Sequence, residues 1–141
     1  MQVTLLFNPG AGAGSASADE LRRVIRSVGH QVEVRRTRKS GIAKALRDPG
    51  DLVAVAGGDG TVGRVMKLLA GGPVPMAILP AGTANNIATS LGIFGDAARI
   101  VTSWARGEVR RVDVGLVRGP WGECRFVESV GVGLLAHLIT P

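Results

Sequence analysis

The stretch LVAVAGGDGT, residues Leu52–Thr61, decides how this sequence is interpreted. Its first half is a short apolar run, which is typical of a buried strand in a parallel sheet. The run breaks into GGDG at 57–60, and a helical pattern follows over 61–70. A glycine loop between a strand and a helix lets backbone N–H groups converge on an anion at the positive end of the helix dipole. The stretch therefore predicts an α/β fold with an anion site where this strand ends.

Alternating strand and helix patterns extend on both sides of this stretch and fill residues 1–107. Such alternation predicts a Rossmann-like, three-layer α/β domain with a mainly parallel sheet. The segment 32–37 alternates polar with apolar residues, so we expect that strand nearer the edge of the sheet. The predicted strands are 3–7, 32–37, 52–56 and 75–79, and the predicted helices are one that Ser15 or Ser17 caps and that continues to Val28, and 41–47, 61–70, 84–91 and 96–106.

Residues 108–141 follow a different pattern. The segments 109–117 and 124–132 alternate like antiparallel strands, and the glycine- and proline-containing segment 118–122 between them is a hairpin signal. An apolar run at 130–139 comes just before Pro141, and natural domains rarely leave such a run uncovered. We therefore expect a β-hairpin that opens a truncated, β-rich second domain, and a chain that is part of a longer protein.

Charge and composition restrict the partners. The 141 residues carry 17 basic and 11 acidic side chains, a net charge of +6, which favours phosphate ligands, nucleic acid or an anionic membrane surface without choosing among them. Aromatic residues make up only 4% of the chain and are scattered, so a base-stacking platform is not expected. We therefore expect no nucleic-acid partner.

Cysteine content and hydropathy indicate the compartment. Cys124 is the single cysteine, which excludes a disulfide framework within the chain and fits a reducing cytosol; its strand pattern predicts a buried side chain. The first residues lack the basic and cleavage regions of a signal peptide. The uncharged stretch 68–95 is interrupted by prolines and asparagines, so no transmembrane span is expected. These features predict a cytoplasmic protein.

Two further glycine loops follow predicted strands. The loop NPGAGAG at 8–14 lacks the Lys-Ser/Thr of a Walker A loop and the acidic partner of a dinucleotide fingerprint, so a plain flexible loop and a phosphate contact are both open. The loop PAGTANN at 80–86 offers Thr83 and two amides, which could cap a helix or bind a ligand. Three such loops at the carboxyl ends of strands predict one ligand crevice in an open α/β sheet.

Asp59 is the candidate functional carboxylate. A carboxylate repels a phosphate, so Asp59 fits the anion site only if a divalent cation or its waters lie between the two. The alternative is a strand-to-helix turn in which Asp59 caps its own helix. Glycine or aspartate at four of the five positions 57–61 is more than such a turn needs, which favours the functional interpretation.

The ordered motifs resemble the catalytic domain of diacylglycerol kinases and sphingosine kinases, which are related more distantly to NAD kinases and 6-phosphofructokinases. The resemblance rests on Asn8-Pro9 with Gly12, Thr37, GGDGT at 57–61, and Gly82-Thr83-x-Asn85, and it covers essentially the whole chain. It implies an α/β domain that binds ATP and Mg²⁺. It also implies a β-rich second domain that closes the cleft and supplies much of the lipid site and the general base.

The resemblance assigns roles position by position. Asp59 matches the essential carboxylate, catalytic and metal-associated, and Asp113 matches an acidic position of a water-mediated Mg²⁺ network, although a polar residue at a strand end explains Asp113 equally well. Asn86 and Leu135 stand where many relatives have aspartate, which leaves fewer carboxylates for metal. The implied nucleotide-contacting positions are Asn8, Pro9, Gly10, Ala11, Gly12, Thr37, Gly57, Gly58, Asp59, Gly60, Thr61, Val62, Gly63, Gly82, Thr83 and Asn85.

These features together predict an ATP-dependent lipid kinase that transfers the γ-phosphoryl group of ATP to a lipid hydroxyl such as that of diacylglycerol. This chain is expected to be its ATP-binding half, inactive alone, with Mg²⁺ as cofactor and a lipid substrate met at the membrane periphery. The alternatives are an NAD kinase-like enzyme, a catalytically silent nucleotide-binding module and, last, a nucleic-acid-binding module that the net charge of +6 would suit. No pattern decides the oligomeric state, and a homodimer stays open.

Overall fold

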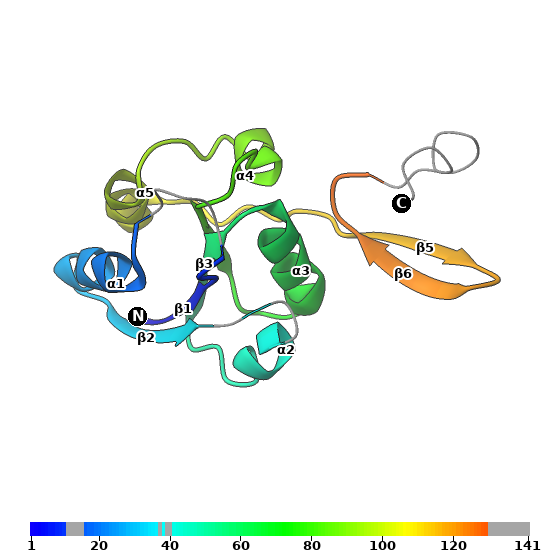
Figure 1. Ribbon diagram of the computed structural model, residues 1–141, viewed down its shortest axis with the longest axis horizontal. Helices are drawn as coiled ribbons and strands as arrows, with labels where there is room; N and C mark the ends of the chain where they lie inside the picture. Colours follow the sequence, from blue (N-terminus) through cyan, green and yellow to red (C-terminus); the bar gives the residue numbers. More distant parts are fainter. Residues whose placement is uncertain (11–15, 37, 39–40, 130–141) are drawn as a thin grey trace.

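The computed structural model describes residues 1–10, 16–36, 38 and 41–129. In these residues an α/β unit is followed by a β-hairpin that extends to one side of it (Figure 1). No helix in these ranges has the length and apolar composition needed to cross a membrane. The elements are β1 (Gln2–Phe7), α1 (Ala18–Ser27), β2 (Gln31–Arg36), α2 (Ile42–Ala45), β3 (Leu52–Gly57), α3 (Asp59–Leu69), β4 (Met76–Pro80), α4 (Asn86–Ser90), α5 (Ala97–Ser103), the 3₁₀ helix η2 (Trp104–Arg106), β5 (Gly115–Gly119) and β6 (Gly122–Phe126).

The first four strands form one parallel sheet in the order β2-β1-β3-β4. β3 lies inside the sheet and is buried along its whole length, as its continuous apolar sequence predicts. β2 lies at an edge, as expected, and alternates exposed with half-buried residues from Gln31 to Val34; Thr37 lies outside the described residues. The predicted α/β fold with a parallel sheet is therefore confirmed.

Helices cover both faces of the sheet, because alternate side chains of each strand point to opposite sides. α1 and α5 pack on one face, and α2, α3 and α4 pack on the other (Figure 1). The first face buries Val3, Leu5, Leu21, Ile25, Leu52, Ala54, Ala56, Leu79, Ile100 and Val101, and the second buries Leu6, Ile42, Val53, Val55, Val62, Val65, Met66, Ile78, Ile87 and Ala88.

The antiparallel hairpin of β5 and β6 has its own means of stabilisation. Its register pairs Gly115 with Phe126, and the Phe126 ring lies so close to Gly115 that a Cβ there would meet it at 2.3 Å. At the turn, the Trp121 ring lies over Gly119 in the same way, 2.5 Å from a Cβ placed there. Each aromatic ring thus fills the space that a glycine leaves on the sheet.

Several boundaries differ from the prediction. α4 is shorter than 84–91 because Asn85 has a left-handed backbone with a φ of 54°, which separates it from the helix. The hairpin strands are shorter than 109–117 and 124–132, since the ladder runs only from the Gly115–Phe126 pair to the turn; residues 130–132 lie outside the described ranges. Cys124, predicted to be buried, is exposed because little packs on the faces of this two-stranded hairpin. The division into domains at 107 stays a prediction.

Candidate functional site

The strand order creates a crevice at the carboxyl edge of the sheet. From β1 the chain crosses to β2 on one side, and from β3 it crosses to β4 on the other, so the loops that leave β1 and β3 diverge. The register places Phe7 beside Ala56 and Gly57 beside Pro80. The three loops that the sequence singled out therefore start side by side, as predicted.

Asn8 joins the first loop to the second. Its backbone N–H donates to the carbonyl oxygen of Ala56 at 3.2 Å, and its side-chain Nδ2 donates to Oγ1 of the buried Thr61 at 3.1 Å. Its Oδ1 accepts the N–H of Gly10 at 3.1 Å. Both polar atoms of the Asn8 side chain bond other residues of the loops, so this side chain fixes the position of the first loop relative to the second. Pro9 and Gly10 stay exposed next to it.

The second and third loops touch through their backbones. A Cβ on Gly82 would lie 2.5 Å from Cα of Gly58, and one on Gly58 would lie 3.1 Å from Cα of Gly82. A Cβ on Gly57 would meet the Thr61 side chain at 2.9 Å. From the sequence, these glycines were expected to let backbone N–H groups approach an anion. The structure adds a second reason, since only glycine lets these two loops come so close.

Asp59 connects the second loop to the third. Gly58, with φ −89° and ψ −179°, is the N-cap of α3, so Asp59 is the first residue of that helix and does not cap it. The Asp59 Oδ1 instead accepts the N–H of Ile87 at 3.0 Å, in the first turn of α4. The alternative in which Asp59 caps its own helix is therefore wrong, and its half-buried carboxylate connects two of the loops.

Asn85 closes the third loop on itself. Its Oδ1 accepts the N–H of Gly82 at 2.9 Å, and its Nδ2 donates to the carbonyl oxygen of Gly82 at 2.7 Å. The amide is thus used within the loop, where a left-handed backbone is tolerated by asparagine. Thr83 is exposed beside it, and the N-cap position of α4 is Asn85. Thr83 therefore does not cap α4, and its ligand contact stays a prediction.

The remaining predicted site residues divide into two groups. Gly60 is exposed at the start of α3, whereas Val62 and Gly63 are buried in it and shape the helix. Ala11, Gly12 and Thr37 lie outside the described residues, as does Leu135.

Asp113 lies apart from Asp59. It is exposed, and it lines an open groove of about 1240 Å³ together with Met66 and Leu69 of the C-terminal half of α3, whereas Asp59 begins that helix and does not line the groove. The described residues contain no group of three or more histidine, cysteine or acidic side chains that could hold a metal. A joint role of Asp59 and Asp113 at one ion stays a prediction.

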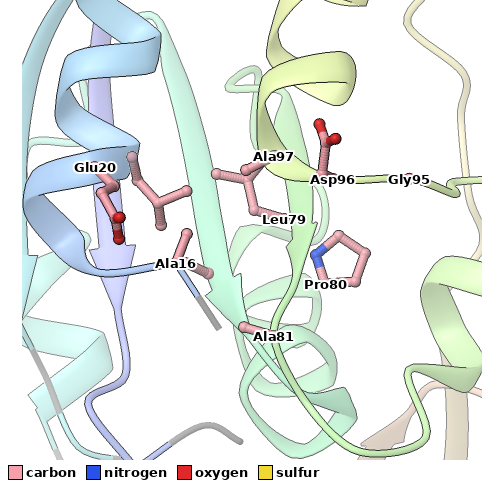
Figure 2. Close-up of a pocket in the computed structure, with 10 residues that line it drawn as sticks. Ala16, Glu20, Leu79, Pro80, Ala81, Gly95, Asp96 and Ala97 are labelled. Atoms are coloured by element: carbon pink, nitrogen blue, oxygen red, sulfur yellow. The ribbon is translucent and has the colours of Figure 1, made fainter. Parts of the chain in front are cut away.

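A cavity of about 500 Å³ lies at the carboxyl ends of β3 and β4, on the face covered by α1 and α5. Figure 2 shows Glu20 and Asp96 on opposite sides of it, with Leu79 from β4 between them. Glu20 and Asp96 were not among the site residues predicted from the sequence. The capping pattern Ser-x-x-Glu at the start of α1 was the signal that could have identified Glu20.

Both acidic side chains of this cavity stabilise helix ends. The Glu20 carboxylate accepts the hydroxyl and the backbone N–H of Ser17, both at 2.7 Å, and the hydroxyl bond is the main cause that lowers the pKa of Glu20. Asp96 Oδ1 accepts the N–H of Arg99 at 2.8 Å at the start of α5. Two carboxylates repel a phosphate, so the glycine loops are the better anion site.

The comparisons with known proteins agree with this geometry. Residues 2–117 match the diacylglycerol kinase catalytic domain. A "probable lipid kinase YegS-like" protein of Pectobacterium atrosepticum is 37% identical over 127 residues, which are 82% of this chain and 42% of that protein. A diacylglycerol kinase of Mycobacterium tuberculosis is 33% identical over 99 residues, 65% of this chain and 32% of that protein.

Solved structures show the same relationship. The crystal structure of a diacylglycerol kinase from Bacillus anthracis superposes with a TM-score of 0.65 at 28% identity, over 80% of this chain and 42% of that one. The chain thus spans less than half the length of these relatives. The resemblance drawn from the glycine loops is confirmed, and the chain belongs to the diacylglycerol kinase catalytic domain family.

Proposed function

We propose that this chain is the ATP-binding half of a lipid kinase that transfers the γ-phosphoryl group of ATP to a lipid hydroxyl, such as that of diacylglycerol. The observation that carries the proposal is the junction of three glycine loops at one edge of the sheet, with Asp59 at the start of α3. Relatives named as kinases support the use of ATP.

The N-terminus of α3 supplies the anion site. The first bonds of the helix run from the N–H groups of Thr61 and Val62 to the carbonyl oxygen of Gly58, at 2.9 and 3.0 Å. The N–H groups of Asp59 and Gly60 come before them, where a helix has donors without intrahelical acceptors. The helix dipole adds a positive partial charge at the same point. These donors suit the phosphates of a nucleotide.

Asp59 suits a magnesium ion that accompanies those phosphates. Mg²⁺ prefers oxygen ligands and is commonly held by one or two carboxylates together with substrate phosphates. Oδ1 of Asp59 accepts the Ile87 N–H, which leaves its second oxygen for the cation or a bound water. When bound, Mg²⁺ neutralises charge on the phosphates. The protein's own part is to hold Asp59 and the helix donors in place.

The proposal also concerns the lipid acceptor and the base that takes the proton of its hydroxyl group. We infer that much of the binding site for the lipid and the base belong to the part of the relatives that this chain does not span, so this chain binds ATP without phosphorylating diacylglycerol. A lipid acceptor requires contact with a membrane surface, and the net charge of +6 favours an anionic one.

One observation favours the alternative of a catalytically silent nucleotide-binding module. Asn86, which stands where many relatives have aspartate, is the first residue of α4 and is exposed. It directly precedes Ile87, whose N–H binds Asp59. The family's second carboxylate would therefore lie near Asp59, and its absence weakens the site for metal. Turnover by a longer form of the protein separates the two functions.

The effect of Asp59→Asn on the affinity for ATP tests the proposal. An asparagine keeps the oxygen that accepts the Ile87 N–H but loses the charge, so the fold should persist. We expect the affinity for ATP with Mg²⁺, measured by titration calorimetry, to fall about 10- to 100-fold, the range known for groups that support a metal site. The loss should disappear when EDTA removes Mg²⁺ from both proteins.

The matched control is Asp51→Asn. Asp51 accepts the N–H of Gln2 at 2.7 Å, at the opposite edge of the sheet, so the same loss of charge should leave ATP affinity unchanged. Asp59→Ala, which also removes the bond to Ile87, should in addition cost about 0.5–2 kcal/mol of stability, the usual cost of a lost helix cap. Equal ATP affinity of Asp59→Asn and the parent protein would refute the role of Asp59.

A further inference from the structure

The hairpin meets the α/β unit at the C-terminal end of α3. Nη1 of Arg125, in β6, donates to the backbone carbonyl of Lys67 at 2.9 Å, although the two residues are 58 positions apart. Lys67 lies in the last turn of α3, which ends at Leu69. The final carbonyls of a helix have no intrahelical donors, and a cation is favoured there by the helix dipole. Arg125 supplies both a donor and a positive charge.

A second contact supports the same junction. Val127 follows the last residue of β6 directly. Val127 is half-buried and packs against the hydrophobic cluster that includes Val62, Val65 and Met66 of α3. A polar contact with α3 and an apolar contact with the core cluster to which α3 contributes therefore both hold the end of the hairpin against the α/β unit.

α3 also carries the candidate site. Asp59 occupies its first turn and Lys67 its last, and an 11-residue helix is a short, stiff element. Whatever orients the hairpin on the last turn of α3 therefore orients it with respect to the glycine loops.

We propose that Arg125 is a positioning residue that fixes the hairpin, and residues 127–129 that follow it, in one orientation relative to α3 and the crevice. This inference goes beyond the proposed function, because it requires neither a nucleotide nor a lipid. Arg118 is its natural control. Its Nε donates to Oε2 of Glu123 at 2.8 Å, so its ion pair lies entirely within the hairpin and makes no connection to α3.

The test measures the spread of distances between the hairpin and the α/β unit. Cys124 is the only cysteine and is exposed, so it accepts a spin label without further change. Ala98→Cys adds a second label at an exposed position of α5, on the face of the sheet opposite α3. Double electron–electron resonance then compares the labelled parent chain with Arg125→Gln, Arg125→Lys and Arg118→Gln, and circular dichroism checks that each is folded.

We expect a narrow distance distribution in the parent chain and loss of that narrow distribution in Arg125→Gln. Arg125→Lys should restore it, because an ammonium group can also donate to the Lys67 carbonyl at the helix C-terminus, and Arg118→Gln should leave it unchanged. A broad distribution in the parent, no broadening in Arg125→Gln, or equal broadening in Arg118→Gln would each overturn the proposal. None of these results depends on ATP, so they leave the test of Asp59 independent.

Discussion

The α/β unit and the hairpin achieve order in different ways. In the α/β unit, both faces of the sheet are covered by helices, and all six residues of β3 are buried. In the hairpin, four of the five residues of β6 are exposed, and its side-chain contacts include two aromatic rings over glycines, one ion pair and Arg125. Apolar burial therefore stabilises the first region, whereas a few directed contacts order the second.

This difference indicates which contacts make the candidate site rigid. The loops after β1, β3 and β4 begin on buried strands and are joined to one another by Asn8, Asp59 and the contact of Gly58 with Gly82. A phosphate site needs such fixed donors, since donors that must reorganise stabilise charge less well. The described part of the hairpin has no comparable set of buried contacts, so its position depends on a few contacts such as that of Arg125 with α3.

The largest expected effect contrasts one leucine from each region. Leu5 in β1 is 0% exposed, and Leu5→Ala should cost about 2–5 kcal/mol of stability through lost burial and the cavity left behind. Leu116 in β5 is 46% exposed, and Leu116→Ala should change stability by less than about 0.5 kcal/mol. Urea unfolding of the two variants measures both values, and comparable losses would contradict the contrast between the two regions.

A smaller effect concerns the close contact of the loops. Gly82→Ala places a methyl group 2.5 Å from the Cα of Gly58, and backbone must move to admit it. We expect a loss of about 1–3 kcal/mol, the usual cost of overpacking, together with weaker ATP binding.

The control for this change is Gly63→Ala. A Cβ there meets only the end of the Ile87 side chain at 3.5 Å, inside a helix that favours alanine. Thermal unfolding should show Gly63→Ala to be stabilised by about 0.5–1 kcal/mol. If Gly82→Ala were as stable as the parent protein, close approach would not be the reason for glycine at that position.

The smallest expected effect tests the start of α1 through pH. The Ser17 hydroxyl bond lowers the pKa of Glu20 in the folded protein. A group with a lowered folded pKa stabilises the protein above its ordinary pKa, and that contribution is lost as the pH falls through the folded value. Between neutral pH and about pH 3, the range in which glutamate titrates, the melting temperature of Ser17→Ala should therefore fall by less than that of the parent protein.

Ser27→Ala is the matched control at the other end of α1. The Ser27 hydroxyl donates to the carbonyl oxygen of Val24 and touches no carboxylate, so the acid dependence should stay that of the parent protein. A melting profile of Ser17→Ala that falls with acid as steeply as the parent's would show that the hydroxyl bond does not hold the Glu20 charge.

Much of the α/β unit could be predicted from local pattern. The run at 52–56, the alternation that begins at 32 and the starts of the glycine loops each depend on residues close together in the chain, and the described residues confirm a strand at the first two and a loop after each of three strands. The hairpin was predicted as a hairpin but with strands that were too long. Alternation alone does not say how far pairing continues, and the described pairing extends only from Gly115 to Phe126.

The sequence by itself determined that three glycine loops follow parallel strands, and hence the family and the edge of the sheet where a ligand would lie. Only the tertiary structure decided what the individual residues do there. Asp59 binds a helix 28 positions away, and Arg125 binds one 58 positions away. Local propensity acts over a few residues, whereas these contacts exist because strand order and register bring distant loops together. Their partners can therefore be named only after the chain has folded.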